Sequence, residues 1–81
     1  MTYTVVVLHE ADGRYSVVVP ALSGCATWGE NLPEALRMAE EAILAYLDGL
    51  AALGKPTPPD MAPVTVDLGE AREAWTYAIH A

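Results

Sequence analysis

The sequence predicts an α+β fold, in which an antiparallel sheet of three to four strands, in the order β-β-β-α-β, carries one long helix on one face. Two runs rich in β-branched residues flank an Asp12-Gly13 turn, and an apolar stripe with helical spacing follows between Leu32 and Leu53. A length of 81 residues leaves room for one domain. We expect residues 1–69 to form it, and residues 70–81 to form a C-terminal tail that is a candidate oligomer contact.

The first expected element is a hairpin. Residues 3–9 and 15–19 are rich in valine, threonine and tyrosine, which suit strands. Asp-Gly between two such runs favours a tight turn, because glycine tolerates the positive φ that the turn requires. Pro20 ends the second strand, since it has no N–H to donate. The first strand is apolar on both faces, so one helix would leave an apolar sheet face for another copy or a partner.

A short third strand and the helix come next. Cys25–Trp28 is expected to form the strand, after a small-residue loop in which Gly24 can adopt conformations closed to other residues. Asn31 is a good N-cap, and Gly54 is a good helix terminator. The predicted core-facing stripe, with spacings of three and four residues, consists of Leu32, Ala35, Leu36, Ala39, Ile43, Tyr46, Leu47 and Leu50.

The C-terminal third is harder to interpret. Residues 55–63 hold four prolines in nine positions and predict an extended connector. Val64–Leu68 alternates and predicts a further strand. Residues 70–80 leave two alternatives: Trp75, Tyr77 and Ile79 alternate as in a strand, whereas the alanines suit a helix, which we favour for the start of the segment.

The charge balance bears on the choice of partner. Eleven acidic residues stand against four basic ones, for a formal net charge of −7, and the basic residues form no stripe. Direct nucleic-acid binding is therefore not expected, because it depends on lysine and arginine neutralising phosphates. An acidic surface favours a basic protein partner, although it can also serve solubility alone.

The sequence also indicates the cellular compartment in which the protein is found. Cys25 is the sole cysteine, so no internal disulfide can form. Neither a signal peptide nor an apolar stretch of bilayer length is visible, which predicts a cytoplasmic protein.

Residues with catalytic potential do not form a recognisable site. Metal-dependent nucleases need converging carboxylates, and the middle of the first strand offers none. Glu10 and Asp12 lie at the hairpin turn, where solvated acidic residues are ordinary. His9 has no identifiable nucleophile beside it, and Cys25 is better explained as a buried small hydrophobe than as a nucleophile. We therefore predict a protein that is not an enzyme and that needs no metal or cofactor.

Two tryptophans are candidates for partner contact. Tryptophan is enriched among interface hot spots, yet either residue could simply fill the core of a small domain. Trp28 and Trp75, together with Glu10 and Asp12, are the candidate contact residues.

Several segments together resemble the HicB-like antitoxin family. They are residues 15–20, a strand ending in proline; residues 21–29, a loop with Gly-Cys and then Thr and Gly two apart; and residues 32–39, the start of an alanine-rich helix. A glycine and a proline-rich stretch follow at residues 54–59. The resemblance covers roughly residues 3–68, and its motif positions, read as structural, are Pro20, Gly24, Cys25, Thr27, Gly29, Ala35 and Ala39.

This resemblance implies a reduced ribonuclease H-like fold that has lost its catalytic carboxylates. It also implies that the chain binds and neutralises a HicA-type toxin, a small basic RNA-cleaving protein, by covering the toxin's active and RNA-binding surface. Many members carry a C-terminal DNA-binding segment. Here only Arg72 is basic after the last predicted strand, so DNA binding by this chain is not expected.

The sequence is compatible with three functions. The first is toxin neutralisation. The second is a stand-alone regulatory or binding module, a homo-oligomer (dimer or tetramer) without a cognate toxin. The third, least favoured, is a residual nuclease.

Overall fold

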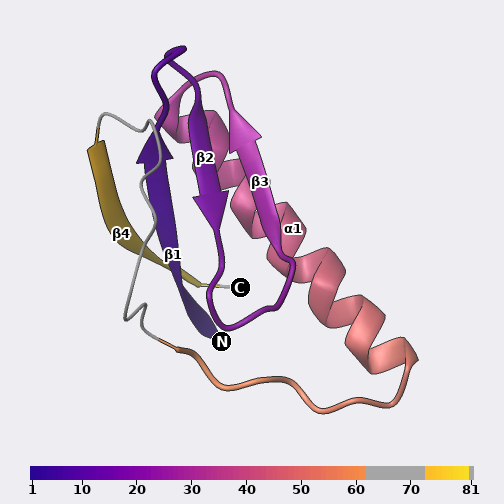
Figure 1. Cartoon of the computed structure of the whole chain (residues 1–81). Helices are drawn as coiled ribbons and strands as arrows, with labels where there is room; N and C mark the ends of the chain where they lie inside the picture. The colour runs from indigo at the N-terminus through magenta and orange to yellow at the C-terminus, as the bar shows by residue number, and fades with distance from the viewer. Residues whose placement is uncertain (62–72, 81) are drawn as a thin grey trace.

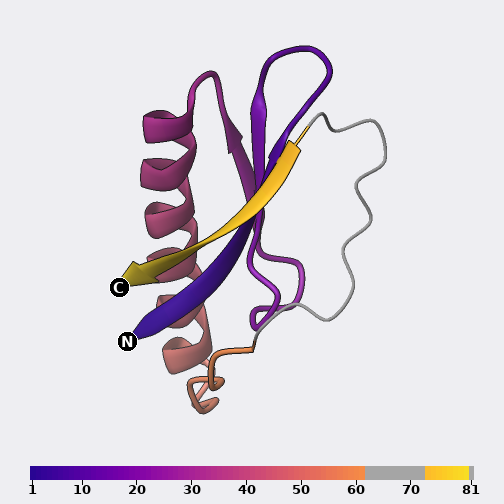
Figure 2. The same ribbon diagram turned by 90° about the vertical axis from the view of Figure 1, so that its left-hand side faces the viewer.

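In a computed structural model, which describes residues 1–61 and 73–80, four antiparallel strands form one sheet against a helix (Figure 1). The elements are, in chain order, β1 (Thr2–His9), β2 (Tyr15–Val18), β3 (Ala26–Gly29), α1 (Leu32–Ala52) and β4 (Glu73–His80). Their order in the sheet is β3-β2-β1-β4, so the last strand lies beside the first. The helix lies on one side of the sheet (Figure 2). The predicted α+β fold and its β-β-β-α-β order are confirmed.

The β1–β2 hairpin closes as the Asp-Gly pair predicted. Gly13 has a φ of +96°, a backbone conformation that residues other than glycine rarely adopt. The N–H of Glu10 donates to the carbonyl of Arg14 at 2.8 Å, and the N–H of Gly13 donates to the carbonyl of Glu10 at 3.0 Å. The turn therefore fixes the register, in which His9 faces Tyr15 and Val7 faces Val17.

Both ends of α1 lie where the sequence placed them. Asn31 Oδ1 accepts the N–H of Glu34 at 2.9 Å, and Glu34 Oε1 accepts the N–H of Glu30 at 3.1 Å. Two N–H groups near the helix start, which lack helical partners, are thereby satisfied. At the other end Gly54 takes a φ of +70° and its N–H donates to the carbonyl of Ala51, so the chain leaves the helix there.

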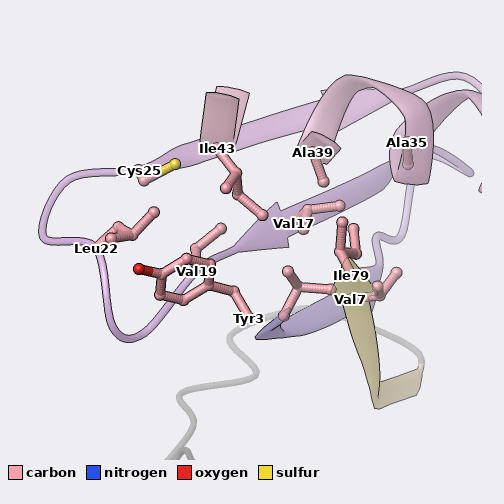
Figure 3. Packing of buried hydrophobic residues seen from close by; sticks show 11 residues of the cluster. Tyr3, Val7, Val17, Val19, Leu22, Cys25, Ala35, Ala39, Ile43 and Ile79 are labelled. Carbon is pink, nitrogen blue, oxygen red and sulfur yellow. The ribbon is translucent and has the colours of Figure 1, made fainter. Parts of the chain in front are cut away.

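The core lies between α1 and the sheet (Figure 3). Ala35, Ala39 and Ile43 are one helical turn apart and fully buried, which confirms the centre of the predicted stripe. Their partners on the sheet side include Tyr3, Val5, Val7 and Val17, all with no exposed surface. The loop after β2 adds Leu22 and Cys25 to the same cluster. Small residues on α1 let the helix lie close to the sheet, so a domain of this size obtains one dense core.

The proline-rich connector folds back onto β1. The buried phenol of Tyr3 donates a hydrogen bond to the carbonyl of Pro58, 55 residues later. One residue further along β1, the N–H and Oγ1 of Thr4 each donate to the carboxylate of Asp60 at 2.8 Å. The connector is therefore attached to the sheet as well as extended.

The last strand corrects part of the sequence analysis. The strand expected over Val64–Leu68 lies outside the described residues. For residues 73–80 the strand alternative holds, so the helix favoured for the start of the segment does not extend into them; residues 70–72 lie outside the described residues. The reason is a long-range pairing: all eight residues of β4 pair with β1, from His9↔Glu73 to Thr2↔His80. Trp75, Tyr77 and Ile79 consequently face the helix side, opposite Val7, Val5 and Tyr3.

Candidate functional site

The side chains with catalytic potential can be placed in the described residues. In residues 1–61 and 73–80, no group of three His, Cys, Asp or Glu side chains lies close enough to hold a metal ion. Cys25 is a free thiol at 7 % exposure, and burial raises its pKa above the ordinary value. Since the thiolate is the reactive form, a raised pKa opposes a role as nucleophile. Cys25 instead contributes to the core, as the sequence indicated.

The β1–β2 turn and the β3–α1 connection lie at the same end of the molecule (Figure 1). We call the residues gathered there the hairpin-end surface: Glu10, Asp12, Arg14, Trp28 and Glu30. Arg14 connects them. Its Nε donates to Asp12 Oδ2 at 2.8 Å, and its guanidinium carbon lies 5.0 Å from the centre of the Trp28 ring. Such a cation–π contact holds the indole beside the turn.

The electrostatics of this surface are acidic. The backbone N–H of Arg14, followed by its guanidinium, holds the pKa of Asp12 below its ordinary value. The side-chain bond to Asp12 raises the pKa of Arg14, and the charges of Glu30 and Glu10 raise it further. One guanidinium thus stands among three carboxylates, and both members of the Asp12–Arg14 ion pair are 51 % exposed. Exposed charge of this kind contributes little to stability, which leaves it available for recognition.

Trp28 is the large apolar component of this surface. It faces Ser16 across the β2–β3 pair, on the sheet face opposite α1, and is 49 % exposed. Val18 is 42 % exposed beside Ala26, its direct partner on β3. Half-exposed aromatic and aliphatic side chains are common in protein contact surfaces. The structure therefore brings together three of the four candidate contact residues: Glu10, Asp12 and Trp28.

Trp75, the fourth candidate, lies elsewhere. It faces Val7 from β4, so its ring is on the helix side of the sheet. Its Nε1 donates to the hydroxyl of Tyr77 at 2.7 Å, and Tyr15 meets its ring edge-on at 6.2 Å. Tyr15 in turn stacks on His9, with ring centres 4.4 Å apart. Trp75 thus belongs to an aromatic row, half-buried beside the core, that the sequence analysis missed because it joins β1, β2 and β4 only after folding.

The motif positions occupy particular places in the fold. Gly24 has a φ of +78° in the loop between β2 and β3. An added Cβ on Gly29 would lie 2.5 Å from the backbone nitrogen of Ala35, so any side chain there would collide with the start of α1. Thr27 pairs with Val17 inside the sheet, and Ala35 and Ala39 have no exposed surface. Pro20 follows the end of β2.

A family model described as "HicB_like antitoxin of bacterial toxin-antitoxin system" matches residues 3–81. Among curated proteins, a UPF0150 protein of Thermoplasma acidophilum is 45 % identical over 62 residues, which cover 76 % of this chain and 90 % of that protein. A UPF0150 protein of Synechocystis is 39 % identical over 56 residues, covering 69 % of this chain and 71 % of that one.

Solved structures share the fold. The crystal structure of the N-terminal domain of the Burkholderia pseudomallei antitoxin HicB superposes with a TM-score of 0.76 at 22 % identity, covering 100 % of this chain and 98 % of that one. A chain in a HicA3 and HicB3 toxin–antitoxin complex superposes with a TM-score of 0.63 at 26 % identity, over 78 % of this chain and 73 % of that chain. In the described residues of our chain, no helix combines the length and apolarity needed to cross a membrane.

Proposed function

The chain belongs to the HicB-like antitoxin family, and from that premise we propose that it binds and neutralises a small basic RNA-cleaving toxin of the HicA type. The observation that carries the proposal is the family match over residues 3–81. A solved HicA3–HicB3 complex among the similar structures supports the choice of partner. The net charge of −7 supports it too, because a protein that binds RNA presents basic residues.

We place the contact on the hairpin-end surface. The carboxylates of Glu10, Asp12 and Glu30 act on the guanidinium of Arg14 there. Trp28, whose ring lies under that guanidinium, adds an exposed apolar surface. A toxin's lysines and arginines would meet Glu10, Asp12 and Glu30, and an apolar side chain of the toxin would pack on the indole. Complementary charge speeds such an encounter, and a central aromatic residue slows dissociation.

Neutralisation then needs no catalysis by the chain. Carboxylates that occupy the toxin's basic residues compete with RNA phosphates for the same donors, since both are anionic acceptors of Arg and Lys hydrogen bonds. The bound domain also excludes RNA sterically from the toxin's catalytic groups. The chain would therefore act by occupying a surface.

Calorimetric titration of purified variants against a HicA-type toxin from the same organism tests the placement. We expect W28A to weaken binding by about tenfold or more, equivalent to about 1.4 kcal/mol, as loss of a hot-spot aromatic does. The double variant E10K/D12K should weaken it as well and should slow association most at low salt.

Matched controls separate this surface from general effects. E41K/D48K makes the same change in charge at exposed positions of α1, and L53A removes an apolar side chain that is 71 % exposed at the C-terminal end of α1. Both controls should bind as the unaltered chain does. If the controls weaken binding as much as the hairpin-end variants, the contact lies elsewhere.

A further inference from the structure

The carboxylate of Asp12 binds one residue, Arg14, through both of its oxygens. Oδ1 accepts the backbone N–H of Arg14 at 3.0 Å, and Oδ2 accepts its side-chain Nε at 2.8 Å. The terminal nitrogen Nη2 of Arg14 also lies 2.8 Å from Oδ2. The backbone bond holds the carboxylate at the turn, and the side-chain bonds then orient the guanidinium, because its N–H donors form a rigid planar fork. Asp12 therefore orients Arg14 in addition to contributing charge.

The surroundings of Trp28 on its sheet face leave the indole dependent on this guanidinium. Its direct partner on β2 is Ser16, and the residue two positions before it on β3 is Ala26, so both neighbours are small. Side chains of this size restrict the rotation of an indole little. The guanidinium carbon of Arg14, by contrast, lies 5.0 Å from the ring centre. Contact with a planar cation favours one orientation of the ring.

The charge of Arg14 does not account for its place in this surface. A basic partner is attracted by the three carboxylates there and repelled by the one guanidinium. Trp28 is 49 % exposed, and a free side chain that must be ordered on binding lowers affinity by about two- to tenfold. An indole already held in the free chain avoids this loss. Arg14 thus contributes more by ordering Trp28 than by its charge.

We infer that Asp12 and Arg14 are positioning residues that hold the indole of Trp28 in the orientation a partner meets. The carboxylate orients the guanidinium, and the guanidinium orients the ring. The partner in this inference rests on the proposed function, whereas the order of the indole is a property of the free chain. Arg14 acts through Trp28, so its contribution disappears when the indole is removed.

Nuclear magnetic resonance of the free chain tests the first half of this inference. The {1H}–15N NOE of each indole Nε1–H reports motion on the ps–ns timescale, and W28F assigns the two signals. R14K keeps the charge but lacks the planar fork, and D12N keeps a turn-forming Asn-Gly pair but lacks the carboxylate. Both variants should lower the NOE of Trp28. That of Trp75, whose Nε1 donates to Tyr77 at 2.7 Å, should not change.

Binding kinetics with a HicA-type toxin from the same organism test the second half. R14K should leave the association rate unchanged, because the charge is kept, and should speed dissociation by about two- to tenfold. In a W28A background, R14K should have no further effect on dissociation, because a positioning residue acts only through the residue it positions. R37K is the matched control, since Arg37 is exposed on α1, and should alter neither the NOE nor the kinetics.

Several results would overturn the inference. One is a Trp28 indole that stays as ordered in R14K and D12N as in the unaltered chain. Another is a loosened indole with an unchanged dissociation rate. A third is an effect of R14K that persists in the W28A background, which would show that Arg14 contacts the partner directly. A chain that binds no toxin would refute the proposed function instead, and the NOE would still decide whether the two residues hold the indole.

Discussion

Gly29 shows how one residue determines the joint between sheet and helix. A Cβ at this position would lie within 2.5–3.0 Å of backbone atoms of Glu34 and Ala35, and backbone cannot move aside as a side chain can. The family resemblance marked Gly29 as a structural motif position. The close approach itself could not be predicted, because it depends on how α1 folds back against β3. By contrast, Asn31, Gly13 and Gly54 act within a few residues of themselves, and all three were predicted correctly.

G29A is therefore expected to destabilise the chain by about 1–3 kcal/mol, the usual range for overpacking a tight contact. The matched substitution is G49A. An added Cβ at Gly49 meets nothing within 4 Å, and the residue lies inside α1. G49A should raise the free energy of unfolding by up to about 1 kcal/mol, because alanine is the better helix former. Urea denaturation measures both, and equal effects of the two variants would refute the role assigned to Gly29.

At the scale of elements, local signals defined the hairpin and α1, whereas β4 required tertiary information. Alanines at 71, 74 and 78 suit a helix, and Trp75, Tyr77 and Ile79 suit a strand, so propensity alone could not decide. Pairing with β1, about 70 residues away, decides for the strand, because it buries Ile79 and half-buries the two aromatic side chains against the core. The attachment of the connector through Asp60 is a non-local contact of the same kind.

Asp60 gives this attachment a pH dependence. Its carboxylate accepts the N–H and the Oγ1–H of Thr4, and these bonds lower its pKa below the ordinary 3.8. Since the folded pKa is depressed, the stabilisation is fully present above the ordinary pKa and is lost as the pH falls through the lower folded value. D60N should therefore be less stable than the unaltered chain near neutrality, by about 1 kcal/mol or less, because the bonds are exposed to solvent.

Urea denaturation at several pH values measures this effect. The difference between D60N and the unaltered chain should shrink below about pH 3.8. D48N, an exposed position on α1, controls for the change in net charge. A difference that persists undiminished in acid would show that the carboxylate is not what attaches the connector.

At the scale of the whole molecule, the core and the charged surface lie apart. The core lies between α1 and the sheet, and the hairpin-end surface gathers three carboxylates around Arg14, which lies over the ring of Trp28. Composition predicted the acidic balance and the preference for a basic partner. It could not predict that Glu10, Asp12 and Trp28 would meet at one end while Trp75 would lie on the other face. That separation follows from strand register, in which a shift of one residue exchanges the two faces.

The most direct test of the central claim is RNA cleavage by a purified HicA-type toxin from the same organism, measured while the chain is added in increasing amounts. If the chain neutralises the toxin by occupying its RNA-binding surface, cleavage should fall to background once the chain is stoichiometric with the toxin. Added salt should weaken the inhibition, because it screens the charges that draw the two proteins together. A toxin that cleaves RNA at its full rate in the presence of excess folded chain would contradict the account.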